Sequence, residues 1–245
     1  MADNKISRNS YLSKNVGDFP EKMTIGELNF DKVEDLRYGT NPHQPAAFYK
    51  PAGIDSVIGG MEVLKTGKSG LSQTNLEDIS YALNIVKFFD IPAAVCMKHV
   101  NPSGAAVAAP GDSQVDVYKK ARDCDPRAAF GSVVAFNQPV TVDTAKEIMT
   151  SFVECVVAPE FEDGVLDIFN DTENYKLNKH VRVLKCGDVK KLPKYVGDDV
   201  KGYQTIKVLH DGSLVIADPL LTHVKGPEDM AVANGKNKAM GEVTS

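Results

Sequence analysis

Apolar residues along this chain follow two alternating patterns. Short apolar runs are typical of buried strands, and longer segments with apolar residues three and four positions apart are typical of amphipathic helices. The runs predict strands at residues 93–97, 132–136, 154–158 and 181–184. The helical spacing predicts helices at residues 75–89, 115–122, 144–152 and 161–169. Strands that alternate with helices predict an α/β protein with a layered central sheet and flanking helices.

Both ends of the chain are more polar than its middle. Residues 1–35 are predicted to form an N-terminal arm with one short strand at Lys22–Leu28, and residues 36–217 to form one main domain. Within that domain, residues 202–216 alternate on either side of an Asp-Gly pair and predict a hairpin. Residues 218–245 lose this periodicity and are predicted to be a linker or a truncated tail.

The stretch MKHVNPSG, residues 97–104, carries the strongest candidate chemistry. Lys98 and His99 follow a predicted buried strand, which Pro102 and Gly104 are expected to end by forming a turn. Ligands of open α/β sheets bind beyond the carboxyl ends of strands, so a cation and an imidazole there are candidate catalytic groups. The alternative is a histidine that only caps or packs, and a short motif alone does not exclude it.

Two further loops place polar groups beside predicted strands. Residues 36–45 contain Arg37 and Tyr38, in a segment whose glycine and two prolines exclude regular structure. The guanidinium group of an arginine can bind a phosphate or a carboxylate through two N–H groups. Residues 123–131 form a second loop that ends at Gly131, directly before a strand. Both loops are candidate parts of a binding site.

Two other polar residues lie at the ends of predicted elements. Thr74 or Asn75 is expected to be the N-cap of the helix that follows, because both types cap helices well. For Asn75, capping is therefore the alternative to ligand binding. Glu154 opens an apolar strand, where the alternative is a solvated carboxylate at the strand end.

Composition narrows the class of protein. The formal net charge of -5 disfavours a general nucleic-acid binder, which is usually basic. The four cysteines are widely spaced, with no CxxC pair, which disfavours a zinc ribbon and fits a reducing, cytoplasmic setting. No apolar run approaches the length of a membrane span, and the N-terminus lacks the apolar core of a signal peptide. We therefore expect neither a nucleic acid nor a membrane as a partner.

Four motifs in this order resemble one family closely: LRYGTNPHQPAAFY, MKHVNPSGAAVA, DPRAAFGSVVAFN and FVECVVAPEFEDGVLDI. They are similar to the AICAR transformylase portion of the bifunctional enzymes that make inosine monophosphate. The resemblance implies formyl transfer from 10-formyltetrahydrofolate, the co-substrate, to the nucleotide AICAR in purine biosynthesis. It also implies a cytidine-deaminase-like fold, a homodimer and no metal.

The resemblance also implies roles for individual residues. Lys98 and His99 would be catalytic, with His99 moving a proton and Lys98 supplying positive charge. The nucleotide contacts of the family carry over to residues in the first loop, at the helix start, in the second loop and at the strand start, which are Arg37, Tyr38, Asn75, Gly131 and Glu154. Family members often have aspartate at the last of these positions.

Two departures from the family pattern qualify the functional prediction. The separate cyclohydrolase domain that precedes this region in bifunctional members is expected to be missing, which disfavours IMP cyclohydrolase activity. The second transformylase subdomain is also expected to be missing, so that a partner chain would have to supply it. The alternative function is a nucleotide-binding or partner subunit without turnover of its own.

Overall fold

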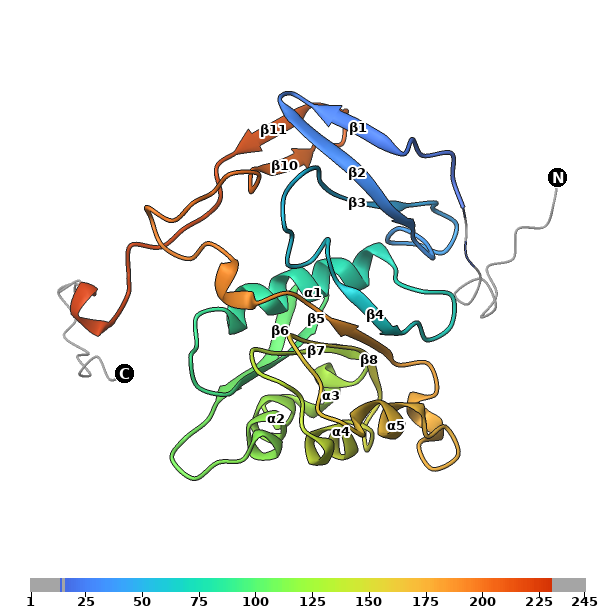
Figure 1. Ribbon diagram of the computed structural model, residues 1–245, viewed down its shortest axis with the longest axis vertical. Helices are drawn as coiled ribbons and strands as arrows, with labels where there is room; N and C mark the ends of the chain where they lie inside the picture. The colour runs from blue at the N-terminus through green and yellow to red at the C-terminus, as the bar shows by residue number, and fades with distance from the viewer. Residues whose placement is uncertain (1–13, 15, 231–245) are drawn as a thin grey trace. The chain divides into compact units, whose positions relative to one another are not determined.

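The main element of the structure is a six-stranded mixed sheet, shown in the computed structural model, which describes residues 14 and 16–230 (Figure 1). β7, β8 and β9 run parallel, whereas β5, β6 and β4 run antiparallel to the strands they pair with. The α/β class and the four predicted central strands are confirmed. In order across the sheet, the strands are β4 (Glu62–Lys65), β9 (Arg182–Lys185), β8 (Val153–Ala158), β7 (Ser132–Phe136), β5 (Ala93–Lys98) and β6 (Asn101–Val107).

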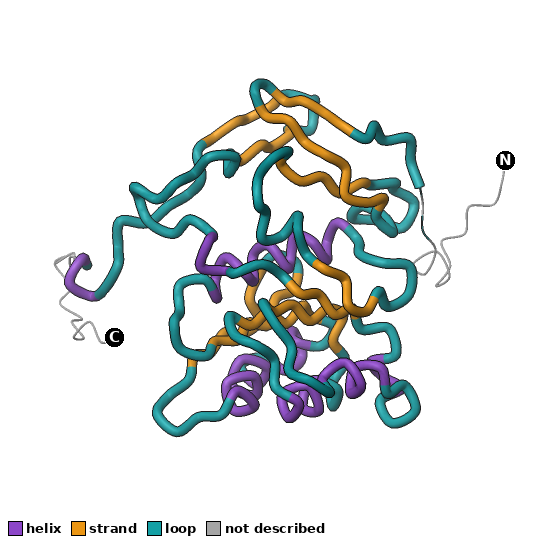
Figure 2. Tube along the Cα trace, in the orientation of Figure 1, coloured by secondary structure: helices purple, strands orange, loops and turns teal. Residues whose placement is uncertain are grey.

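Helices cover both faces of this sheet (Figures 1 and 2). One face packs against α1, and the other packs against the remaining helices and encloses a core that includes Tyr118, Phe136 and Phe169. All four predicted helices are present, although the last two are shorter than predicted. The helices are α1 (Gln73–Val86), α2 (Gln114–Asp123), α3 (Pro126–Ala129), α4 (Val142–Ile148) and α5 (Val165–Asn170), with 3-10 turns at Lys176–Asn178 and Val189–Lys191.

The start of α1 differs from the prediction by a few residues. Ser72, and not Thr74 or Asn75, is the N-cap: its hydroxyl accepts a hydrogen bond from the backbone N–H of Asn75. The Asn75 side chain in turn accepts one from the backbone N–H of Ser72, which completes a capping box. Asn75 therefore contributes to the cap through its oxygen, while its side-chain NH₂ group faces another partner described below.

A smaller antiparallel sheet precedes the main one and consists of β1 (Lys22–Ile25), β2 (Leu28–Asp35) and β3 (Ala47–Pro51). The sequence predicted one strand before residue 36, but the structure has two, joined by a tight turn with Gly26 at positive φ. β2 was missed because half of its eight residues are charged, a composition that favours loops.

Residues from Leu192 onward form a second compact unit, separate from residues 1–191. It contains the predicted hairpin, made of β10 (Thr205–Val208) and β11 (Leu214–Ala217), and a 3-10 turn at Pro227–Asp229. The proposed division of the chain at residues 35 and 217 stays a prediction. Among the described residues, no helix has both the length and the apolar character needed to cross a membrane.

Candidate functional site

One end of the main sheet gathers most of the predicted site residues. β5 runs antiparallel to β7, so its carboxyl end lies beside the amino ends of β7, β8 and β9. Lys98 therefore lies at the same end of the sheet as Gly131 and Glu154. The rule that ligands bind beyond carboxyl ends of strands describes β5 alone, because the neighbouring strands present their amino ends here.

The turn after β5 lies elsewhere than predicted. Lys98 pairs with Asn101, which leaves a two-residue loop of His99 and Val100, at φ of 55° and 56°. Two consecutive residues with positive φ are the mark of a type I′ hairpin turn. Pro102 and Gly104 do not end the strand: they belong to β6, which is an edge strand and so tolerates a proline. His99 thus lies at the tip of a hairpin, with its side chain exposed.

Gly104 has a packing function in this hairpin. A Cβ atom at this position would lie 2.0 Å from the carbonyl oxygen of Ala121 in α2. Only glycine allows the backbone of β6 to approach α2 this closely.

Lys98 extends from the end of β5 toward the loop before β7. Its Nζ donates a hydrogen bond to the carbonyl oxygen of Phe130, at 2.6 Å. Gly131 follows at φ of 77°, and a Cβ atom there would lie 3.8 Å from that Nζ and 3.2 Å from the Phe152 ring. The predicted loop 123–131 is in part helical, because Pro126–Ala129 form α3 with Asp125 as the N-cap. The structure thus brings Lys98 and Gly131 together.

Asn75 and Glu154 also meet, from opposite parts of the sequence. The Asn75 Nδ2 donates a hydrogen bond to Glu154 Oε2 at 2.9 Å, which joins the first turn of α1 to the start of β8. Asn75 is buried and Glu154 is half-buried. The carboxylate of Glu154 is therefore held in place, and its remaining lone pairs can accept a further hydrogen bond.

Arg37 and Tyr38 lie in the loop between β2 and β3, and both are buried. The Arg37 Nη2 donates to the Tyr38 hydroxyl at 2.9 Å, and the guanidinium carbon lies 4.5 Å from the centre of the Tyr38 ring. The Arg37 Nε is buried and has no hydrogen-bond partner among the described residues. Burial lowers the pKa of Arg37, and the charge of nearby Arg182 lowers it further, while Glu154 raises it. Arg37 therefore lies close to Glu154 and Arg182.

Arg182 is a residue that sequence reasoning missed. It begins β9 with 4% of its surface exposed. Its guanidinium donates to three backbone carbonyl oxygens, of Gly70 at 2.7 Å, Lys68 at 3.4 Å and Glu154 at 3.5 Å. An arginine inside a buried apolar run such as Val181–Leu184 was the available signal, because a buried charge needs a specific set of partners.

Asp78 is the second residue that was missed. It lies one turn after Asn75 on α1 and is 7% exposed. Its Oδ1 accepts a hydrogen bond from the backbone N–H of Val100 at 2.7 Å. Burial raises the pKa of Asp78, and the backbone amides of Val100 and His99 act against this rise. The signal was its spacing: residues three apart on a helix share a face.

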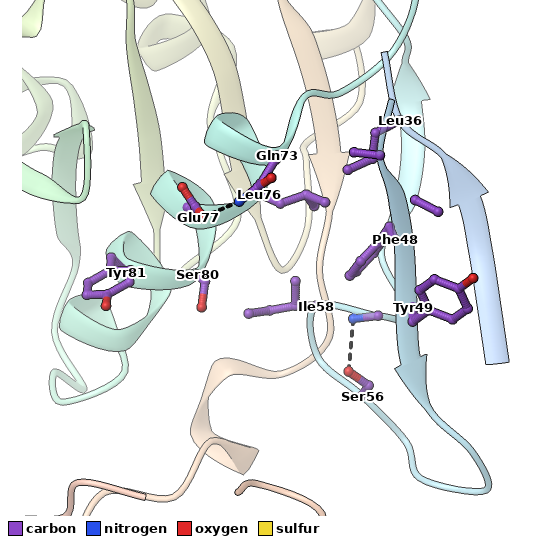
Figure 3. Close-up of a pocket in the computed structure, with 13 residues that line it drawn as sticks. Leu36, Phe48, Tyr49, Ser56, Ile58, Gln73, Leu76, Glu77, Ser80 and Tyr81 are labelled. Atoms are coloured by element: carbon purple, nitrogen blue, oxygen red, sulfur yellow. Dashed lines mark hydrogen bonds between the residues drawn. The ribbon is translucent and has the colours of Figure 1, made fainter. Parts of the chain in front are cut away.

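The best-defined cavity of the described residues lies outside this cluster. It has a volume of about 440 Å³ and lies between the outward side of α1 and β3, with the following loop along its edge (Figure 3). Leu36, Phe48 and Ile58 line it, together with Glu77 and Tyr81 of α1. None of the predicted site residues lines this cavity.

Other chemistry at the site is limited by burial. Burial raises the pKa of the thiols of Cys96, Cys155 and Cys186 to about 12, so they are not nucleophiles near neutral pH. Within the part of the chain that the structure describes, no group of three or more His, Cys, Asp or Glu side chains could hold a metal ion.

These features describe an α/β protein with a polar site at one end of a mixed sheet. The chain belongs to the AICARFT/IMPCHase bienzyme family, whose model matches residues 2–231. It is 40% identical over 189 residues to the bifunctional purine biosynthesis protein PurH of Acetivibrio thermocellus, which covers 75% of this chain and 34% of that protein. The PurH of Magnetococcus marinus is 39% identical over 204 residues, or 82% of this chain and 37% of that protein. The chain thus spans about a third of the length of the relatives it matches.

Proposed function

We propose that this chain carries part of an AICAR formyltransferase site and acts in purine biosynthesis. The observation that carries the proposal is the charge of the site. Lys98, Arg37 and Arg182 make their described hydrogen bonds to neutral oxygens, of Phe130, of Tyr38 and of three backbone carbonyls respectively. Their positive charge is not neutralised by a directly bonded carboxylate, which suits an anionic substrate such as a nucleotide phosphate.

The reaction needs three things from the protein. The amine of AICAR is a poor nucleophile, because its lone pair is conjugated with the imidazole and the carboxamide. A group must therefore remove a proton as the amine attacks the formyl carbon, and His99 at the tip of the hairpin has the right chemistry. Lys98 supplies positive charge for the developing oxyanion or for the leaving nitrogen of the folate.

Orientation of the nucleotide is the third requirement. Arg37 and Tyr38 would bind the phosphate, and Glu154, held by Asn75, would accept from the carboxamide or the ribose. Gly131 leaves room next to Lys98, since a side chain there would approach its ammonium group. The proposal includes 10-formyltetrahydrofolate as co-substrate, no metal, a cytoplasmic location, and a second copy or a partner chain that completes the site.

The test is a formyl-transfer assay with AICAR on the full chain, alone and with a chain that carries the remaining family region. Replacing His99 with Ala should lower the rate by roughly two to four orders of magnitude, the usual contribution of a positioned proton-transfer group. His210→Ala is the matched control, because that imidazole is also exposed but belongs to the second unit. A His99→Ala protein with near-normal turnover would contradict the proposal.

The same assay separates the alternatives. Comparing 10-formyltetrahydrofolate with formate plus ATP identifies the formyl donor. Tight AICAR binding without turnover in any combination would favour a nucleotide-binding subunit instead. Conversion of formylated AICAR to inosine monophosphate by the chain would favour cyclohydrolase activity.

A further inference from the structure

The hairpin tip that presents His99 has a backbone conformation that needs support. His99 and Val100 both lie at positive φ, and neither is glycine. Residues with a Cβ atom avoid this region, and a β-branched residue such as valine is an outlier there. Such conformations persist only where the surroundings enforce them.

The support comes from α1. The Asp78 carboxylate, 7% exposed, accepts the Val100 N–H at 2.7 Å and so reaches directly into the turn. A carboxylate that accepts a backbone N–H makes a stronger hydrogen bond than a neutral acceptor does. Other charged groups also act on Asp78: the charge of His99 favours its ionised form, and the charge of Glu154 opposes it.

We infer that Asp78 is a positioning residue, which holds the His99–Val100 turn in its left-handed conformation and so keeps His99 at the polar end of the sheet. This inference rests on the proposed function for the role of His99, but the conformation of the turn does not. Asp78 and Asn75 share one face of α1, so a single helix then orients two parts of the site, the turn through Asp78 and Glu154 through Asn75.

Glu77 provides a matched control on the same helix. It lies next to Asp78 in sequence but lines the cavity on the outward side of α1, where its Oε1 accepts a hydrogen bond from Gln73 Nε2 at 2.8 Å (Figure 3). Replacing Glu77 with Ala removes a carboxylate from α1 without touching the turn.

The experiment is amide hydrogen exchange by NMR on the full chain. Asp78→Ala should speed exchange of the Val100 amide by roughly tenfold or more, since local opening no longer breaks a charged hydrogen bond. Asp78→Asn keeps an acceptor oxygen and should stay between the two. Glu77→Ala should leave the Val100 amide unchanged. Equal protection of this amide in Asp78→Ala and in the unaltered protein would overturn the inference.

A second variant separates support of the turn from a general effect on folding. Glycine adopts positive φ without cost, so adding Val100→Gly to Asp78→Ala should restore the chemical shifts of the hairpin residues around the turn. If the double variant remains as perturbed as Asp78→Ala alone, the carboxylate does not act through the turn.

Kinetics then tests the consequence for the site. In an assembly that transfers formyl groups, Asp78→Ala should lower kcat by roughly tenfold or more and leave AICAR affinity within about twofold, because it displaces a group used only in the transition state. Val100→Gly should recover much of that loss. If the turn responds as stated but the unaltered protein never transfers a formyl group, the proposed function fails and the assignment of Asp78 to the turn stands.

Discussion

Replacing Gly104 with Ala should destabilise the first unit by about 2–3 kcal/mol. The added Cβ would lie 2.0 Å from the carbonyl oxygen of Ala121, whereas real Cβ atoms essentially never come closer than 3.0 Å. β6 and α2 must therefore separate by about 1 Å. Val117 and Tyr118 of α2 are fully buried in this interface. A gap of this size removes a quarter to a half of the dispersion energy of each contact, and full burial of such side chains contributes about 1.5–3 kcal/mol each.

The assay is urea unfolding followed by far-UV circular dichroism, since the chain has no tryptophan. Gly187→Ala is the matched control: its Cβ would meet only Val57, at 3.4 Å, and its φ is not positive, so stability should change by no more than about 0.5 kcal/mol. If Gly104→Ala unfolds at the same urea concentration as the unaltered protein, β6 does not approach α2 as described. Equal losses for both variants would show a general intolerance of alanine and refute the packing argument.

Three other predictions concern thiols and arginines. A thiol reagent at about pH 8 should label one cysteine per native chain, the exposed Cys124, and all four after unfolding, because burial raises the pKa of the other three thiols to about 12; rapid labelling of more than one native thiol would contradict this. Arg182→Lys should cost about 1–3 kcal/mol in urea unfolding, since an ammonium group cannot reproduce the forked contacts to three carbonyls; unchanged stability would show that these contacts contribute little. Arg37→Ala should weaken AICAR binding by about 1.5–3 kcal/mol in calorimetry, as expected for the loss of a charged hydrogen bond; unchanged affinity would remove Arg37 from the proposed site.

The sequence predicted the parts of the fold that depend on apolar periodicity. β5, β7, β8 and β9 are buried on both faces, so their residues form the uninterrupted apolar runs from which strands are easily predicted. β2 and β4 were not predicted. β4 is an edge strand of four residues, two of them charged, and strands that face solvent carry no such run.

The hairpin of β5 and β6 shows why local rules failed at the site. Asn-Pro-Ser-Gly has the composition of a turn, yet it begins β6. The true turn consists of His99 and Val100, which local preference disfavours at positive φ. The Asp78 carboxylate lies 22 residues away in sequence, and no local rule accounts for it. Tertiary contacts therefore decide the backbone at the residue that matters most for the proposed chemistry.

The residues of the candidate site could be predicted as a set, but their grouping could not. Glu154 and Asn75 are 79 residues apart in sequence, and they meet only because β8 begins at the end of the sheet where α1 begins. The antiparallel placement of β5 brings Lys98 to the same end. An all-parallel order would have placed Lys98 at the opposite end from Glu154, since carboxyl and amino ends of parallel strands lie on opposite edges. The reversal of one strand is thus what allows a cation from the end of β5 and a carboxylate from the start of β8 to serve one site.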